Sequence, residues 1–430
     1  MGKRKRILLL ALLLIVSGKT YSINNGEVKT EQNIINGTGN WADKGTVTVT
    51  ESGKINVSGA ASGVGIKNSG TVTNNGEINA SEANSKGLNF GSGGGTAENN
   101  NKITATGEGI GVYFGAKGEF VNNSTGVFEI KGNNSKGIYL NSQGTATNEG
   151  LITIGGTATG EAGAIGVLVN NVSAKFTNES GGTIESIGAN SKGIQVNAGE
   201  AINEGNIQAT ERASGVYVNG ATGSFYNDLS GEIVVSGKDS KGIHFGSGGG
   251  TAENSGTISV TEKGIGTYFG GKGTFTNKDS GKIKATGTDS KGIYLNSQGT
   301  ATNEGLITVG GTATGEAGAI GVQVNNADAK FTNSSSEEKG IFVIGTNSKG
   351  IQVNAGEAIN NGYIQATEGA SGVYVNGTSG SFTNNSGGKI VTSGASSKGI
   401  FFGSNGGTAE NSGTIEVSDG ASGVFFYQGT

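Results

Sequence analysis

The sequence predicts an all-β protein, a parallel β-helix of about 15 rungs with three short strands in each rung. A glycine followed by an apolar residue (once by Thr267) recurs from Gly63 to Gly423 in 14 steps over 360 residues, so the mean repeat is about 26 residues. Each repeat holds three segments in which apolar and polar residues alternate between Gly, Asn and Ser, the pattern of strands separated by turns. Stacked coils of this kind form a solenoid.

One repeat illustrates the three expected strands. Around Gly137 they are Ile138–Leu140, Ala146–Asn148 and Gly150–Ile154. The 84 glycines do not indicate collagen, because the chain has no proline and no persistent G-x-y triplet. A left-handed hexapeptide helix needs about 18 residues per coil and an apolar residue every six, which the sequence lacks.

Two periodic positions support the stacking. An Asn follows each anchor glycine by 10 to 12 residues, from Asn74 to Asn411, and we expect these side chains to form a hydrogen-bonded ladder at left-handed turns. The residue two before that Asn alternates strictly between Ala and Phe from Ala97 to Ala409. Stacked about 4.8 Å apart, each ring would fill the space beside an alanine, so the natural unit is two rungs.

The chain divides into three expected parts. Residues 1–22 combine a basic start, ten apolar residues from Ile7 to Val16 and a small, polar end, which is typical of a secretory signal peptide. Residues 23–45 are expected to cap the β-helix, because an open end would expose unpaired strand edges. Residues 46–430 form the repetitive β-helix, which stops in mid-rung and is expected to be truncated at its C-terminal end.

Composition argues against several classes of function. The chain has no Cys and one His, so we expect no catalytic, cofactor-binding or metal-binding residues. Residues 1–22 carry five basic side chains and no acidic one, so the formal charge changes from −4 to −9 when they are removed. An acidic chain whose remaining arginine is Arg212 is not expected to bind nucleic acid.

The first candidate site is a row of aromatic side chains. In the first strand of each rung the middle residue should point outward. This position is often aromatic, and the row also includes His244, which we expect to be exposed. The candidate binding residues are Tyr113, Tyr139, Tyr217, Tyr268, Tyr294, Tyr374, Phe401 and Phe425. The row either docks a glycan or protein, or its rings stack and stiffen the sheet.

A second row consists of the lysines of a repeated Ser-Lys-Gly motif. They occupy every other rung, about 10 Å apart, and this spacing suits charges in a solvated turn as well as an anion-binding stripe. The lysines are Lys86, Lys136, Lys192, Lys241, Lys291, Lys349 and Lys398.

The signal peptide, the cysteine-free Gly/Asn/Ser/Thr-rich coils and repeated turns such as Asn254–Ile258 and Asn411–Ile415 resemble the passenger domain of autotransporter (type V secretion) adhesins, over about residues 46–430. The resemblance implies a right-handed β-helix at a Gram-negative cell surface or outside the cell. The implied partners are the outer-membrane translocation machinery and an unidentified glycan or protein receptor on host or bacterial cells. We expect the chain to be an N-terminal fragment of such a passenger, lacking the C-terminal transmembrane β-barrel of the family.

Three functions remain open from the sequence. The first is an adhesin stalk that binds through an elongated, multivalent face. The second is a passive spacer whose adhesive part is missing. The third is a polysaccharide-acting enzyme on the same scaffold, which one His and one remaining Arg make the weakest of the three.

Overall fold

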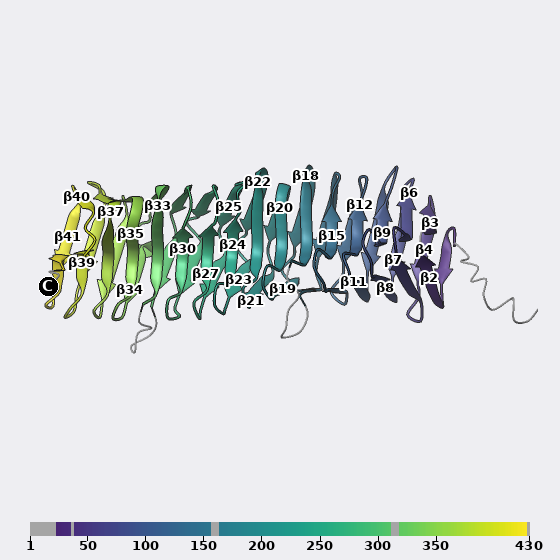
Figure 1. The fold of residues 1–430 in the computed structure, drawn as a ribbon, viewed down its shortest axis with the longest axis horizontal. Helices are drawn as coiled ribbons and strands as arrows, with labels where there is room; N and C mark the ends of the chain where they lie inside the picture. The colour runs from purple at the N-terminus through teal and green to yellow at the C-terminus, as the bar shows by residue number, and fades with distance from the viewer. Residues whose placement is uncertain (1–22, 36–37, 156–162, 311–317, 428–430) are drawn as a thin grey trace, which may run out of the picture.

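The computed structural model describes residues 23–35, 38–155, 163–310 and 318–427, and the expected signal peptide lies outside them. The described chain forms an elongated solenoid, with its N-terminal strands at one end and its C-terminal strands at the other (Figure 1). Its 42 strands all pair in parallel, and the helical structure described is one 3-10 turn, η1 (Glu337–Lys339). No helix in the described ranges is long and apolar enough to cross a membrane. The predicted all-β parallel solenoid is confirmed.

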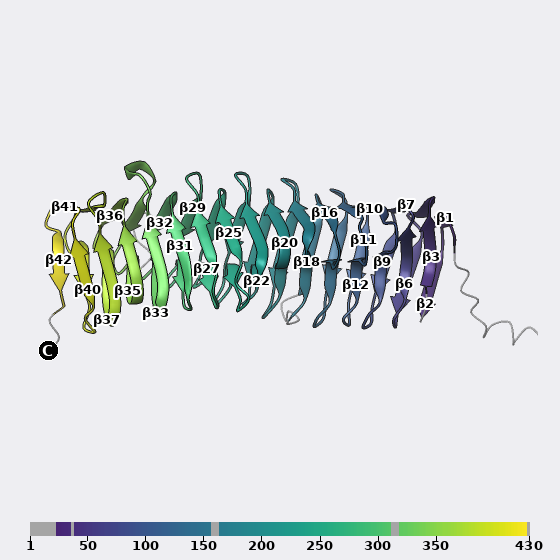
Figure 2. The same cartoon turned by 90° about the horizontal axis from the view of Figure 1, so that it is seen from above.

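One sheet, sheet B, contributes a single strand to every complete rung. Its neighbours are the equivalent strands one rung before and after, so the sheet runs along the rod (Figure 2). Its 16 strands are β2 (Glu31–Ile35), β5 (Lys54–Ser58), β8 (Glu77–Ala80), β11 (Lys102–Ala105), β14 (Val127–Ile130), β17 (Leu151–Ile154), β19 (Thr183–Ile187), β21 (Asn206–Thr210), β23 (Glu232–Val235), β26 (Thr257–Val260), β29 (Lys282–Ala285), β32 (Leu306–Val309), β34 (Ile341–Ile344), β36 (Tyr363–Thr367), β38 (Lys389–Thr392) and β41 (Thr414–Val417).

The other sheet, sheet A, contains the first two strands of each rung. The first strands, which carry the anchor glycine, are β3 (Thr38–Asp43), β6 (Ser62–Lys67), β9 (Lys86–Phe90), β12 (Ile110–Phe114), β15 (Lys136–Leu140), β24 (Lys241–Phe245), β27 (Ile265–Phe269), β30 (Lys291–Leu295), β39 (Lys398–Phe402) and β42 (Ser422–Phe426). The second strands are β1 (Gly26–Val28), β4 (Thr46–Val49), β7 (Gly70–Asn74), β10 (Gly95–Asn99), β13 (Glu119–Asn122), β16 (Gly144–Asn148), β25 (Thr251–Asn254), β28 (Thr274–Asn277), β31 (Gly299–Asn303) and β40 (Thr408–Asn411). In six rungs the two are continuous, as β18 (Ile165–Asn178), β20 (Lys192–Asn203), β22 (Ser214–Asn227), β33 (Ile320–Asn333), β35 (Lys349–Asn360) and β37 (Ser371–Asn384).

The first strands of the described chain continue the same coil. β1 pairs with β4, β2 with β5, and β3 with β6, all in parallel. The cap expected over residues 23–45 therefore lies in a segment that supplies strands to both sheets. Its effect on the end of the solenoid stays a prediction.

The predicted alternation of Phe and Ala is confirmed in the strand register of sheet A. Ala252 pairs with Phe275, and Phe275 pairs with Ala301. The same register holds in every pair from Ala97 to Ala409. Every Phe of this row is at most 1% exposed. Each ring is therefore flanked by two alanines, which gives it room without leaving a void.

The asparagine ladder is also confirmed, but its backbone conformation differs from the expectation. Each Asn donates from Nδ2 to Oδ1 of the Asn one rung on, over 2.7 to 2.9 Å, from Asn74 to Asn411. None of these asparagines has a positive φ. They end the second strands with their side chains buried, except for Asn411, so the ladder satisfies polar groups inside the coil and does not require a left-handed turn.

The anchor glycines are required by the close stacking of rungs. A Cβ added to Gly242 would lie 2.6 Å from the carbonyl oxygen of Gly266 and 3.0 Å from a methyl of Val235. Gly137 and Gly292 would meet the next rung's glycine carbonyl at 2.5 and 2.6 Å in the same way. The repeated glycine thus marks where the backbone of one rung lies against the next, which is the physical origin of the most visible signal in the sequence.

Candidate functional site

The first strands place two kinds of side chain on the same outer surface. In β15, Lys136 and Tyr139 are partly exposed, whereas Gly137, Ile138 and Leu140 are buried. The same pattern, with two consecutive buried residues between the outward ones, recurs in β9, β24 and β30. Strict alternation would send residues three apart to opposite faces, so the two buried residues shift the alternation and bring lysine and aromatic ring to one side.

The aromatic row is in register from rung to rung, and its rings contact one another. Tyr113 and Tyr139 have ring centroids 5.4 Å apart. A run of four joins Tyr217, His244, Tyr268 and Tyr294 at 4.8, 5.1 and 5.6 Å. A third group joins Tyr374, Phe401 and Phe425 at 4.9 and 5.5 Å. The predicted row therefore exists as three clusters.

The gaps between the clusters are filled by non-aromatic residues at the same register position. Leu168 and Gln195 separate the first cluster from the second, and Gln323 and Gln352 separate the second from the third. The rings are also less exposed than the sequence suggested. All but Phe425, which is 39% exposed, are only partly accessible, because each lies against its neighbours and against lysine side chains.

The structure brings the two predicted rows together. Every lysine of the Ser-Lys-Gly motif holds its ammonium over an aromatic ring, with Nζ 5.1 to 6.0 Å from a ring centroid. Lys136, Lys291 and Lys398 use the ring of their own rung. The other four use the ring of the next rung, in the pairs Lys86–Tyr113, Lys192–Tyr217, Lys241–Tyr268 and Lys349–Tyr374. We call these seven lysines and the eight predicted aromatic residues the lysine–aromatic face.

A backbone hydrogen bond orients each lysine of the face. Nζ donates to the carbonyl oxygen two residues earlier, over 2.8 to 3.4 Å. That earlier residue has a positive φ in every case, for example 61° at Asn134 and 61° at Asp239. Asn, Asp and Ser at this position make the left-handed turn accessible, and the turn presents its carbonyl to the lysine.

Several residues of the face were not foreseen from the sequence. The lysines alternate in register with Ile or Ser on the intervening rungs, as in Lys86, Ile110 and Lys136. Asn141 bridges two rings, because it accepts from the Tyr139 hydroxyl at 2.7 Å and donates to the Tyr113 hydroxyl at 3.1 Å. Asn296 repeats this bridge between Tyr294 and Tyr268. The repeated Tyr-x-Asn spacing in the sequence is the signal that could have found these asparagines.

The expectation that His244 is exposed is wrong. Its ring lies between those of Tyr217 and Tyr268, and Nδ1 is 3.4 Å from the Ser214 hydroxyl. Burial, followed by the positive charges of Lys241 and Lys192, lowers the pKa of His244 from 6.5 to about 3. The imidazole is therefore neutral at physiological pH and is part of the aromatic cluster.

The single histidine gives a direct test of this placement. We expect its imidazole proton resonances in an NMR titration to remain constant from pH 8 to about pH 4.5, because protonation is opposed by burial and two lysines. The imidazole of the unfolded chain is protonated below pH 6.5, whereas that of the folded chain stays neutral. The contribution of the neutral His244 to the free energy of unfolding is therefore present above pH 6.5 and is lost as the pH falls toward 3. A titration midpoint near 6.5 in the folded chain would contradict the placement.

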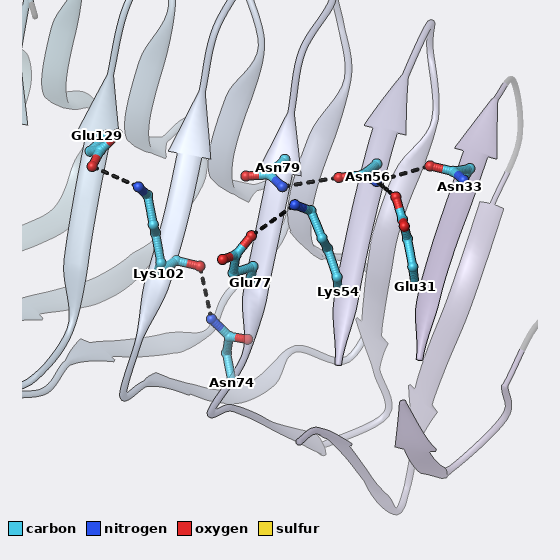
Figure 3. A network of polar contacts seen from close by, with 9 residues as sticks. All are labelled: Glu31, Asn33, Lys54, Asn56, Asn74, Glu77, Asn79, Lys102 and Glu129. Atoms are coloured by element: carbon cyan, nitrogen blue, oxygen red, sulfur yellow. Dashed lines mark hydrogen bonds and ion pairs between the residues drawn. The ribbon is translucent and has the colours of Figure 1, made fainter. Parts of the chain in front are cut away.

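The outer surface of sheet B has a different electrostatic character. Figure 3 shows its N-terminal part, where Lys54 pairs with Glu77 at 3.0 Å and Lys102 with Glu129 at 2.7 Å. Asn56 donates to Asn33 and accepts from Asn79, each over 2.9 Å, continuing the polar contacts across rungs. Lys54, Lys102 and Lys389 on this surface each have a carboxylate partner. By contrast, none of the seven lysines of the face lies within 4.0 Å of a described carboxylate oxygen.

No group of three or more His, Cys, Asp or Glu side chains that could hold a metal ion occurs in the described part of the chain. The arrangement that recurs along the rod is instead a cation beside an aromatic ring. Such a pair can contact an anion and an apolar surface at once.

Comparison with known proteins adds one family match. Residues 159–279, which include β18 to β28, match the model of the family described as the BigA third pectate lyase-like domain. This match supports the resemblance to autotransporter adhesin passenger domains. Among solved structures, the chain is similar to the TibC-catalysed, hyper-glycosylated TibA55-350 fragment, with 16% identity, a TM-score of 0.26, and 93% of this chain and 98% of that chain covered. At this TM-score the likeness carries no conclusion. No curated protein matches the chain.

Proposed function

We propose that the chain is an exported passenger of the autotransporter adhesin type, which attaches a Gram-negative cell to host or bacterial cells through the lysine–aromatic face. The observation that carries the proposal is the repeated pairing of lysine and ring. Seven ammonium groups along one side of the rod each lie over an aromatic ring and lack a carboxylate partner within the described residues. The beginning of the sequence, with its basic and apolar segments, supports export.

The repetition of the face suits attachment through many weak contacts. A lysine occurs on every second rung, so successive units are about 10 Å apart along the rod. Once one unit is bound, the next contacts the same surface at a high effective concentration, and the overall affinity rises without any single strong contact. A rigid, straight scaffold favours this, because little conformational freedom is lost when further units bind.

The proposal assigns no catalytic activity to the chain. The one imidazole is neutral and packed between two tyrosines, so it is poorly placed to transfer protons near neutral pH. The repeated units of the face are nearly equivalent, whereas a catalytic centre is usually a single constellation. Attachment is therefore favoured over polysaccharide cleavage.

A passive spacer is the second candidate, and one observation favours it. The rings of the face contact one another, and the lysines cover them, so these contacts alone would stiffen the rod. In that case the face would stabilise the solenoid and bind nothing.

Binding of the labelled full chain to epithelial cells and to Gram-negative bacterial cells tests the proposal. A face variant carries Tyr→Ser changes at six positions, namely Tyr113, Tyr139, Tyr217, Tyr268, Tyr294 and Tyr374. We expect saturable binding by the natural chain and at least about a tenfold loss in the variant, because six of the seven lysines lose the ring beside them.

The control carries the same change at Tyr226 and Tyr363, which point outward on other surfaces of the rod. Circular dichroism establishes that all three proteins are folded. Equal binding by the face variant and the control would place attachment elsewhere on the chain. No binding by the folded natural chain would support the spacer.

A further inference from the structure

The seven lysines form one straight stripe with a defined period. In sheet A, Lys192 pairs with Ser214 and Ser214 with Lys241, and then Lys241 pairs with Ile265 and Ile265 with Lys291. The stripe therefore alternates strictly between a cation and a small or apolar side chain. The intervening residues are nearly buried, Ser214 at 7% and Ile265 at 8% exposed. Successive ammonium groups are thus two rungs, or about 10 Å, apart.

Each ammonium is held in place but is only partly satisfied. It donates one hydrogen bond to a turn carbonyl, as Lys241 does to Asp239 over 2.8 Å, which leaves two N–H groups for solvent or a ligand. Burial lowers the pKa of Lys136 and Lys192. The carboxylates of Glu108, Asp239 and Asp289 act on the stripe from a distance, and none forms an ion pair with its lysines. A partly desolvated cation of this kind gains from an added anion.

The rings add a second kind of contact with the same period. Beside each ammonium lies an aromatic ring, and in the central cluster the rings continue without a gap from Tyr217 to Tyr294. A partly exposed aromatic ring can pack against the apolar face of a sugar ring while its hydroxyl group stays hydrated. An extended chain of pyranose rings advances by about one strand spacing per ring, and so by about two rungs per disaccharide.

We propose that the lysine–aromatic face binds a linear acidic polysaccharide that carries one carboxylate in each disaccharide, with one disaccharide in step with each pair of rungs. The lysine of every second rung contacts the carboxylate, and the rings contact the sugars. This inference rests on the proposed function and names the ligand class of the same face.

The charge spacing favours this ligand over a denser polyanion. Duplex DNA carries one charge per about 1.7 Å of axis, so a stripe with one cation per about 10 Å would leave most phosphates without a partner. The chain as a whole also repels such a polymer, because its formal net charge is −4. In a polymer whose carboxylates are spaced like the lysines, each carboxylate can contact one ammonium group. No unpaired anionic groups then remain along the stripe to be repelled by the acidic chain.

Hyaluronan oligosaccharides, which alternate a uronic acid with a neutral amino sugar, are the probe. Calorimetry or surface plasmon resonance with the full chain should show affinity rising from tetrasaccharide to dodecasaccharide, because longer chains span more lysines. We expect the triple change Lys192→Gln, Lys241→Gln and Lys291→Gln to weaken dodecasaccharide binding at least about tenfold. The variant's remaining affinity should also depend less on salt, because three ion pairs that salt screens are removed.

A matched control removes the same number of charges from sheet B, with Lys54→Gln, Lys102→Gln and Lys282→Gln. It should bind hyaluronan like the natural chain. A second variant, with Tyr217→Leu, Tyr268→Leu and Tyr294→Leu, keeps the charges and should also lose binding. Neutral dextran and poly-L-glutamate separate the contributions of sugar and charge, and both should bind more weakly than hyaluronan.

The inference would be overturned if the triple lysine variant of the face and that of sheet B lost hyaluronan affinity equally. It would also be overturned if poly-L-glutamate bound as tightly as hyaluronan. Cell attachment that depends on the face, without hyaluronan binding, would overturn the ligand class and leave the adhesin function in place. Hyaluronan binding by the face without cell attachment would support the ligand class and contradict the adhesin function.

Discussion

Replacing Phe275 with Ala is expected to lower the free energy of unfolding by about 3–5 kcal/mol, the range for removing a buried ring. The ring is fully buried, and its register partners on the adjacent rungs are Ala252 and Ala301. The change would leave three alanines in consecutive rungs, with no ring at the flanking positions of this row. Urea denaturation followed by circular dichroism measures the loss. Hydrogen exchange over β25 to β31 shows whether it is local, since a solenoid can unfold in segments.

The matched control for this prediction is Phe342→Ala. Phe342 lies on the outer surface of β34, partly exposed, with its ring 5.7 Å from that of Tyr363. The same chemical change should cost less than about 1.5 kcal/mol there, because only one ring contact is lost. If the two variants were destabilised equally, the alternation of Phe and Ala would not be a packing device.

Replacing Asn254 with Asp is expected to destabilise the coil by about 3 kcal/mol at neutral pH. The Asn254 amide accepts from Asn227 and donates to Asn277, each over 2.7 Å, and also donates to the Gly256 carbonyl at 3.2 Å. A carboxylate can still accept from Asn227, but it has no proton to donate and would face two oxygen atoms within the buried ladder. The loss should appear in urea denaturation at pH 7.

The pH dependence of this variant distinguishes a broken ladder from a general packing defect. Burial beside oxygen atoms raises the pKa of the introduced carboxyl above its ordinary value, so folding takes up a proton. The stability lost at pH 7 should therefore be partly regained as the pH falls toward 4, where the protonated group can donate to Asn277. The exposed control Asn385→Asp, whose side chain donates to Asn361, should show little loss at either pH. A deficit of Asn254→Asp that is independent of pH would contradict the ladder mechanism.

In the proposed binding mode, the same side chains of the solenoid serve rigidity and recognition. The lysines that would contact a ligand also cover the rings that hold successive rungs together. Changes to the face are therefore compared with changes of the same kind on other surfaces, because a loss of binding is meaningful only when the coil is intact. The two triple lysine variants can be compared directly, since each removes three positive charges from the rod's surface.

The sequence by itself determined the coil, its period and which residues point inward. Parallel strands stacked in register turn a period in the sequence directly into neighbours in space, so Phe275 between two alanines, and Asn254 between two asparagines, could be predicted without coordinates. It also showed both rows of the candidate site. The backbone conformation of the ladder and the environment of His244 were predicted wrongly, because both depend on how strand ends and side chains pack.

Only the tertiary structure decided that the lysine row and the aromatic row form one face. Two consecutive buried residues bring Lys136 and Tyr139 to the same side, although residues three apart in an ideal strand point to opposite sides. Lys86 reaches Tyr113, 27 residues along the chain, because stacking places their rungs side by side and a turn carbonyl orients the ammonium. Register alone does not fix the direction of a flexible side chain. That direction is set by the neighbours against which the side chain packs.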